Sequence, residues 1–430
     1  MKKSFFVRKK KIGRCGVAAL LALCMTAGCG RGNRLSPSTE NLMEQYGVRT
    51  VRTGAADAPE IPDGFQTAYA DFSLELLRAS MEEDSENVMI SPLSVLMALE
   101  MTRSGASGET LAQMDEVLYG GLLGADGKQG TQLFSALCTG KEPLAMADSI
   151  WLRTGDGYFT PDDAFLQEAA EDYGAEIYGA PFDQSTVSDI NRWVERGTDG
   201  MVRDILDEIP DEAVMYLVNA VAFDGEWQHP YESYQVWERT FYSADGSESE
   251  VDMMYGTESR YLSGEGVQGF CKYYKDGYSF VALLPDEGIT LEEYLSGLDG
   301  AAFLQTIREW DDTMVETGLP KFEGETSREL SNALKNMGMP MAFDEYAADF
   351  SRMGNVADGS NLYIGRVLHK TYIRVDELGT KAGAATVVEM DAGGAAIMDS
   401  KTVILDHPFL YAVVEDETGL PVFVGVVEQL

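Results

Sequence analysis

The amino-acid sequence predicts an α+β fold, in which one large body follows an export signal and a polar linker. Apolar residues at helical spacing, such as Phe72, Leu76 and Leu77, are frequent early in the body. Strand-like apolar runs come later, at 215–223, 280–284 and 422–427. Because strands and helices do not alternate regularly, a doubly wound parallel sheet is not expected. The length of 430 residues and the 45% hydrophobic content are enough for a large buried core.

The chain begins with the three parts of a secretory signal. Residues 1–28 contain seven Lys or Arg and no Asp or Glu, and they end in an apolar run at 17–25 and small residues at 26–28. This run is shorter than the roughly 20 residues of a membrane-spanning helix, so we expect residues 1–28 to be removed.

Cys29 follows the small residues directly and therefore resembles the modified cysteine of the bacterial lipobox, although Thr26 replaces the usual Leu. The resemblance implies lipidation of Cys29, a membrane anchor, and a bacterial lipoprotein at the cell surface or in the envelope. The alternative is an incidental cysteine in an extracellular protein.

A polar segment separates the signal from the body. Residues 29–64 contain Pro37, Pro59 and Pro62 with several glycines, and they have no sustained apolar period. We expect a flexible tether over 29–64 that starts at the lipidated cysteine. The folded body then extends over residues 65–430.

The charge and the scarcity of Cys and His exclude several classes of protein. The chain has 71 acidic and 33 basic side chains and a net charge of −38, whereas nucleic-acid binding depends on clustered Lys and Arg. We expect Cys138 and Cys271 to be buried thiols, and a disulfide between them is the alternative. Neither they nor the three scattered histidines form a zinc pattern. We therefore expect no nucleic acid, no metal and no cofactor.

The sequence also lacks the motifs that would predict an enzyme. It contains no G-x-S-x-G, no H-E-x-x-H, no Walker loop and no G-x-G-x-x-G after a strand. Acidic pairs occur throughout the chain, which is typical of solvated faces rather than of an acid–base site. We therefore do not expect an enzyme.

Residues 377–396 stand out because they contain few large apolar side chains. The even positions from Thr380 to Met390 are uncharged and mostly small, whereas Lys381, Glu389 and Asp391 occupy odd positions. This alternation is typical of a half-buried strand whose inner face enters a confined space. A flexible Ala/Gly-rich surface loop is the alternative, but it does not explain the separation of the charges.

The motif E-x-G-T-x-A-x-A-A-T at residues 377–386 is similar to the reactive-loop hinge of inhibitory serpins. Further blocks that resemble this family follow in the family's order over residues 65–430. They are Asn87-Val88, Ser91-Pro92, Ser94, Gly105-Ala106, Gly108, Thr110 and Gln113; Asn219-Ala220, Phe223, Gly225, Trp227 and Pro230; Leu319 to Phe322; Ala348 to Ser351; His369-Lys370; and His407 to Phe409.

The resemblance implies a serpin fold with three β-sheets, eight to nine helices and an exposed reactive-centre loop at about 377–400. The large central sheet A would be able to accept one more strand. A monomer is expected. No heparin-type basic site is expected, because residues 115–150 contain no Lys/Arg cluster.

The activity that the resemblance implies is suicide inhibition of a protease. The nucleophile of the target protease would attack the loop, and the cut loop would insert into sheet A and trap the acyl-enzyme. One alternative is a non-inhibitory serpin that acts as a carrier or chaperone. Another is inhibition of a papain-like cysteine protease.

The resemblance also assigns individual site residues. The hinge consists of Glu377, Gly379, Thr380, Ala382, Ala384, Ala385 and Thr386. The shutter, a polar cluster beneath the point where sheet A parts, consists of Ser91, Ser94, Asn219 and His369. The breach, where the loop first enters, consists of Trp227 and a salt-bridged pair of Lys321 and Glu377.

The reactive bond is expected at one of four small residues, Gly393, Gly394, Ala395 or Ala396, with Ile397 as a weaker candidate. No Arg or Lys lies between residues 389 and 400, so a trypsin-like pocket would have no cation to bind. Small side chains favour a serine protease of elastase-like or subtilisin-like specificity.

Overall fold

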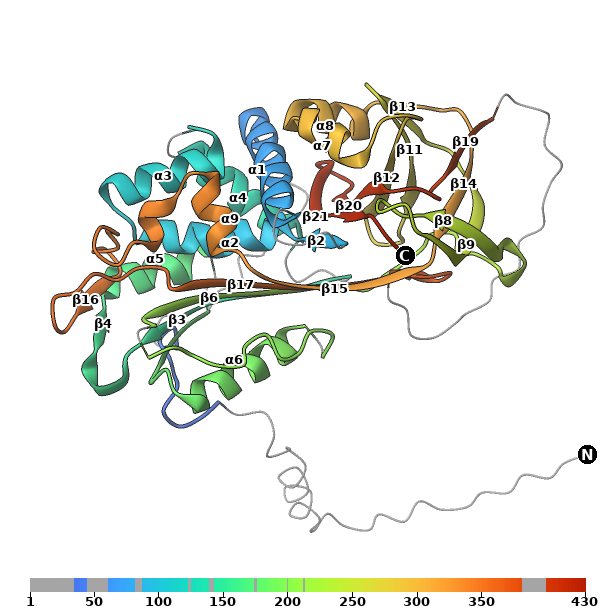
Figure 1. The fold of residues 1–430 in the computed structure, drawn as a ribbon. Coiled ribbons are helices and arrows are strands. Elements are labelled where there is room, and N and C mark those ends of the chain that lie inside the picture. The colour runs from blue at the N-terminus through green and yellow to red at the C-terminus, as the bar shows by residue number, and fades with distance from the viewer. Residues whose placement is uncertain are drawn as a thin grey trace, which may run out of the picture. The chain divides into compact units, whose positions relative to one another are not determined.

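The two halves of sheet A meet along the parallel pair of β6 (Met215–Phe223) and β17 (Arg366–Val375) (Figure 1). The structure is a computed structural model that describes residues 35–44, 61–81, 87–122, 125–138, 143–173, 176–198, 200–211, 213–380 and 400–430. β15 (Phe322–Glu329) pairs with the outer edge of β17. The strand order within the described residues is β1 (Glu40–Asn41), β5 (Glu176–Ala180), β3 (Leu144–Arg153), β6 (Met215–Phe223), β17 (Arg366–Val375), β18 (Gly379–Thr380) and β7 (Gly225–Glu226).

The described residues form two further sheets and a short two-stranded ribbon. The second sheet contains β13 (Trp310–Asp311), β10 (Tyr261–Gly264), β11 (Val267–Tyr273), β12 (Tyr278–Pro285), β20 (Phe409–Glu415), β21 (Leu420–Val427) and β2 (Val88–Ile90). The third contains β19 (Lys401–Ile404), β14 (Val315–Pro320), β9 (Glu248–Glu258) and β8 (Val236–Tyr242). The ribbon pairs β16 (Gly354–Val356) with β4 (Phe159–Pro161).

Helices cover both faces of sheet A, most of them on the side that carries the helix Pro92–Ser104 (Figure 1). The α-helices of the described residues are α1 (Asp63–Met81), α2 (Pro92–Ser104), α3 (Gly108–Tyr119), α4 (Ala125–Cys138), α5 (Asp163–Tyr173), α6 (Gln184–Gly197), α7 (Leu291–Gly297), α8 (Gly300–Arg308) and α9 (Ser331–Met337). Together with the three sheets, they confirm the expected α+β fold.

α2 and α6 contact sheet A from opposite faces (Figure 1). Almost every residue of α2 is buried because the helix packs against both β6 and β21. Its start is fixed by Ser91, whose side chain accepts a hydrogen bond from the Ser94 N–H, and by Pro92 in the first turn. By contrast, α6 buries only the stripe of residues that faces β3 and β6.

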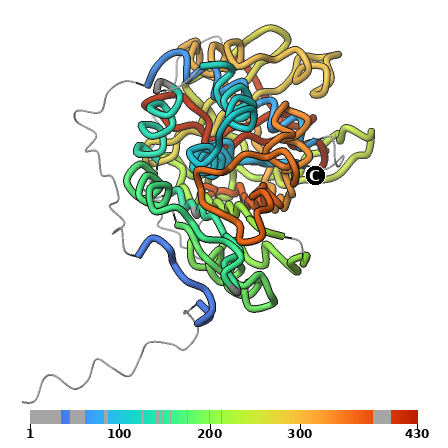
Figure 2. Tube along the Cα trace, turned by 90° about the vertical axis from the view of Figure 1, so that its left-hand side faces the viewer, coloured from blue at the N-terminus to red at the C-terminus, as the bar shows by residue number. Residues whose placement is uncertain are grey.

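The prediction of a flexible tether over the whole of 29–64 is wrong for residues 36–44. β1 extends the edge of sheet A, because Glu40 pairs with Gly179 and Asn41 with Tyr178. The buried carboxylate of Asp189 on α6 accepts hydrogen bonds from the N–H and hydroxyl of Ser36 and from the Thr39 hydroxyl. Figure 2 shows this blue segment beside the green chain of β5 and α6. α1 also begins at Asp63, two residues before the expected start of the body.

Two further expectations concern the cysteines and the membrane. Cys138 and Cys271 are both buried, and no disulfide joins them. Burial raises the pKa of the Cys271 thiol to about 12, so this thiol is protonated and unreactive at neutral pH. Across the described ranges, no helix has the length and apolar character needed to cross a bilayer. Cys29 lies outside the described residues.

Candidate functional site

The centre of the candidate site is the seam between β6 and β17. These strands are parallel, with Arg366 opposite Tyr216 at one end of the pairing and Tyr372 opposite Ala222 at the other. Every residue of β6 is buried, because helices or strands cover both faces. At the middle of the seam, His369 stands directly opposite Asn219. An additional strand between β6 and β17 would therefore have to separate these two side chains.

The hydrogen bonds of His369 fix its protonation. Its ring is fully buried, and burial lowers its pKa to about 3, so it is neutral. The Ser91 N–H donates to Nε2 at 3.0 Å, which places the ring proton on Nδ1. Nδ1 in turn donates to Oδ1 of Asn219 across the seam. The seam is thus closed by a buried hydrogen bond whose direction is determined.

Asn219 extends this network away from the seam. Its amide nitrogen donates to Oδ1 of Asp148 on β3 at 2.5 Å and to the Ser94 hydroxyl. The Ser94 hydroxyl donates to the same Asp148 oxygen at 2.9 Å. The structure therefore brings together all four residues assigned to the shutter.

Asp148 is a member of this cluster that the sequence analysis missed. It stands opposite Asn219 in the antiparallel pairing of β3 with β6. A signal for it does exist in the sequence, since an aspartate in the middle of the strand-like run 144–152 is unusual. Burial raises its pKa to about 7, and the hydrogen bonds from Ser94 and Asn219 oppose this rise.

The breach residues meet at the end of the seam where β17 finishes, at Val375; this is called the upper end of the seam below. Trp227 is fully buried, stacks on Tyr274 with ring centroids 4.3 Å apart, and donates its indole N–H to the Asp376 carbonyl at 2.9 Å. The expected ion pair is present, because Lys321 Nζ lies 3.0 Å from Glu377 Oε1. Lys321 Nζ also lies 2.8 Å from Asp252.

A second missed residue, Lys272 on β11, lies beneath Trp227. Its side chain is buried, and its ammonium is held by Glu258 at 2.8 Å and by the His229 carbonyl at 3.1 Å. The ammonium also lies over the rings of Tyr231 and Trp227, at 4.2 and 5.4 Å from their centroids. Its charge is therefore compensated, and it supports the packing of the breach.

The hinge begins inside sheet A. Gly379 and Thr380 form β18, which pairs with β17 through Thr380 and Val375 and with β7 on its other side. A Cβ on Gly379 would lie 2.0 Å from the Gly225 carbonyl oxygen, so only glycine fits there. Thr380 is fully buried, and its hydroxyl lies 2.5 Å from the Tyr274 hydroxyl. The other hinge residues, Ala382, Ala384, Ala385 and Thr386, and the candidates Gly393 to Ala396 lie outside the described residues.

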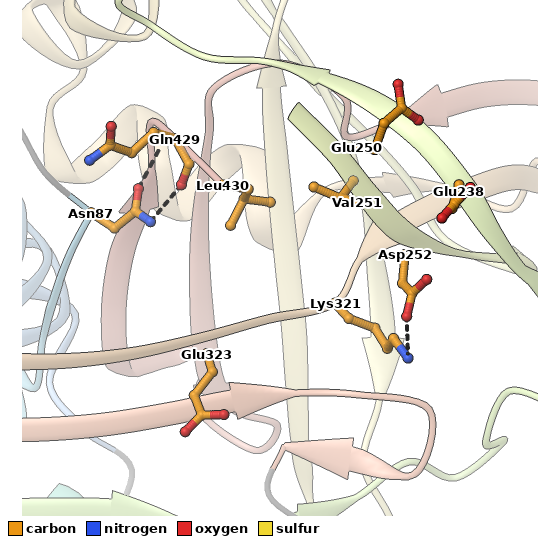
Figure 3. Close-up of a pocket in the computed structure, with 9 residues that line it drawn as sticks. All are labelled: Asn87, Glu238, Glu250, Val251, Asp252, Lys321, Glu323, Gln429 and Leu430. Carbon is orange, nitrogen blue, oxygen red and sulfur yellow. Dashed lines mark hydrogen bonds and ion pairs between the residues drawn. The ribbon is translucent and has the colours of Figure 1, made fainter. Parts of the chain in front are cut away.

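A hollow of about 530 Å³ opens beside the breach (Figure 3). Lys321 is the single cation among the residues that line it, and Figure 3 shows its ammonium directed at Asp252. The hollow is therefore an acidic surface. No cluster of His, Cys, Asp or Glu suited to a metal ion occurs in the part of the chain that the structure describes. The carboxylates that line the hollow belong to Glu238, Glu250, Asp252 and Glu323.

Comparison with known proteins places this geometry in a family. The model of the serpin (serine protease inhibitor) family matches residues 67–430. Serpin-Z2B of Triticum aestivum is 30% identical over 379 residues, which cover 84% of this chain and 94% of that protein.

Solved structures give the same result. The thermophilic serpin tengpin in its native state is 42% identical and superimposes with a TM-score of 0.83, covering 91% of this chain and all of tengpin. Tengpin in its latent state gives a lower TM-score of 0.74 at 40% identity, covering 87% of this chain and 100% of the other. Human thyroxine-binding globulin, at 23% identity, shares the fold with a TM-score of 0.75, covering 85% of this chain and 98% of the other.

Proposed function

Since the chain belongs to the serpin family, we propose that it is an inhibitory serpin that traps a protease as a covalent acyl-enzyme. The observation that carries the proposal is the state of the β6–β17 seam. A buried network closes the seam at His369 and Asn219, while the first hinge residues already occupy its upper end as β18. The seam between β6 and β17 is therefore closed, and β18 is positioned so that the loop after it can enter the seam.

In the proposed mechanism, the nucleophile of the protease attacks the scissile carbonyl in the loop at about 377–400. The peptide bond breaks, the new amine leaves, and an ester or thioester joins the loop to the enzyme. The loop then inserts between β6 and β17 before water can hydrolyse this bond. Insertion separates one parallel ladder, from Arg366–Tyr216 to Tyr372–Ala222, and replaces it with two. The gain in backbone pairing drives the trapping of the enzyme.

The composition of the loop supports a target with a small or apolar specificity pocket. Residues 389–400 contain no Lys or Arg, and the four candidate positions 393–396 are Gly or Ala. An elastase-like or subtilisin-like serine protease fits this composition, and a papain-like cysteine protease is the second target class.

A carrier or chaperone role is the alternative within this family. The likeness to thyroxine-binding globulin concerns the fold alone at 23% identity. The hinge argues for inhibition instead, because Thr380 is small, uncharged and already buried in sheet A.

We further propose an exported, monomeric protein of bacterial origin that is held at the membrane by a lipid on Cys29. The basic and apolar residues before Cys29 and the small residues at 26–28 support this location. Mass spectrometry of the purified protein tests it, and an unmodified Cys29 or a different N-terminus would contradict it.

The inhibitory function is tested by incubating the protein with elastase and with subtilisin, followed by denaturing gel electrophoresis. A stable band at the summed mass of the two proteins is expected. Quantitative cleavage of the loop without such a band would refute inhibition of these enzymes. The same experiment with papain decides between the serine and cysteine protease classes, and mass spectrometry of the released peptide locates the scissile bond.

A further inference from the structure

Asp148 is the titratable end of the network that closes the seam. It receives hydrogen bonds from Asn219 and Ser94, whereas Asn219 is itself the acceptor for His369. The direction of every bond is fixed, because the Ser91 N–H occupies Nε2 of His369. An acceptor at Asp148 therefore keeps the Asn219 amide turned so that its oxygen faces the seam.

Among the described residues, no cation forms an ion pair with Asp148. On α2 it meets the Ser94 hydroxyl, on β6 the Asn219 amide, and beyond the seam the neutral ring of His369 on β17. Lys370, next to His369, is held elsewhere by the Arg203 carbonyl and by Glu325.

Charged side chains on the neighbouring elements also pair with groups other than Asp148. On α6, which covers the opposite face of sheet A, Arg192 pairs with Asp189. On β5, Glu176 accepts from Tyr178 and Trp193. Within the part of the chain that the structure describes, the partners of the Asp148 carboxyl are therefore two neutral donors, Ser94 and Asn219.

We propose that Asp148 is a fifth shutter residue that sets how firmly the seam is closed, holding it most firmly when neutral and loosening it when ionised. The proposal rests on the loop insertion proposed above. Burial is the larger influence on its pKa, which lies at about 7, and hydrogen bonding only partly offsets it. Asp148 is half-buried in the closed seam, and opening the seam exposes its side chain fully to water, where an aspartate has its ordinary pKa of about 3.9. Opening therefore releases a proton and becomes easier as the pH rises through 7.

The test measures how fast a peptide that copies residues 380–392 inserts into the intact protein at pH 6 and at pH 8. For the wild type we expect insertion about tenfold faster at pH 8, because the closed seam is about 90% protonated at pH 6 and about 10% protonated at pH 8. Asp148→Asn keeps an oxygen that accepts from Ser94 and Asn219 but removes the charge. Its insertion rate should therefore stay close to that of the wild type at pH 6 and should change less than about twofold between the two pH values. The matched control is Asp312→Asn, at an exposed aspartate, which should behave as the wild type does.

Amide hydrogen exchange gives a second readout that does not require insertion. Comparing variants at one pH cancels the intrinsic pH effect, so residues 215–223 and 366–375 should exchange more slowly in Asp148→Asn than in the wild type at pH 8. At pH 6 the two proteins should be equal. If no peptide enters even the wild type, the proposed inhibitory function fails, and hydrogen exchange alone then decides the role of Asp148.

The proposal is overturned if Asp148→Asn keeps the pH profile of the wild type, if wild-type insertion slows as the pH rises, or if seam exchange at pH 8 is the same in both proteins. A purely structural role for Asp148 would change overall stability without this pH-dependent difference at the seam.

Discussion

If the chain is the inhibitor proposed above, replacement of Thr380 by arginine should convert it into a substrate. Thr380 is fully buried between β17 and β7, and its hydroxyl lies beside the hydroxyl of Tyr274. Before cleavage the arginine can leave this slot by detaching β18, whereas insertion of the loop would force it back into the slot, where no carboxylate of the described residues contacts Thr380. An unpaired buried charge costs about 3–5 kcal/mol. Since about 1.4 kcal/mol changes a rate tenfold, insertion should slow by more than about a hundredfold.

The readout is the number of moles of protein consumed per mole of protease trapped, measured by titration and denaturing gel electrophoresis. Hydrolysis of the acyl-enzyme is not slowed by the substitution, so cleaved protein should accumulate while the covalent band disappears. Thr380→Ser, which retains the hydroxyl near Tyr274, is the matched control and should inhibit as the wild type does. The reasoning is refuted if the arginine variant traps the protease with unchanged stoichiometry.

Three further substitutions test other parts of the structure. Gly379→Ala should displace β18, because its Cβ would lie 2.0 Å from a β7 carbonyl oxygen, and faster hydrogen exchange in β18 would report this. Asp189→Ala should release residues 36–44 and lower the free energy of unfolding by about 2 kcal/mol, measurable in urea. His369 stays neutral in the folded state down to about pH 3, so it destabilises that state as the pH falls below 6.5. The raised pKa of Asp148 has the opposite effect. His369→Gln should therefore improve acid stability most visibly in an Asp148→Asn background. The reasoning is contradicted if the urea midpoint falls equally from pH 6 to 4 in Asp148→Asn and in the double variant.

Much of the shutter and the breach could be predicted from the sequence, because the residues concerned lie in ordered blocks that resemble one family. Ser91 and Ser94 share the first turn of α2, which a local capping pattern positions. The pairing of Lys321 with Glu377 required only opposite charges at matching positions.

What the sequence could not show depends on contacts between distant segments. Residues 36–44 look like a linker because they are polar and contain a proline, and the group that holds them is Asp189, 153 positions after Ser36. No local pattern encodes this contact. Asp148 and Lys272 were missed for a related reason, since a single charged residue in an apolar strand gives no sign of which side chains will compensate it.

The position of β18 also determines the order in which the seam would open. The entropy of fixing the first loop residues has already been lost, so insertion would extend an existing nucleus and would not have to form one. Thr380 pairs with Val375 in antiparallel register, and His369 lies six residues before Val375 on β17. Continuing this register would bring residue 386 opposite His369, after an advance of about 20 Å at ~3.3 Å per residue. The first steps of insertion would separate only backbone hydrogen bonds between β6 and β17. The shutter would oppose the entering strand only when Thr386, the last hinge residue, reaches His369.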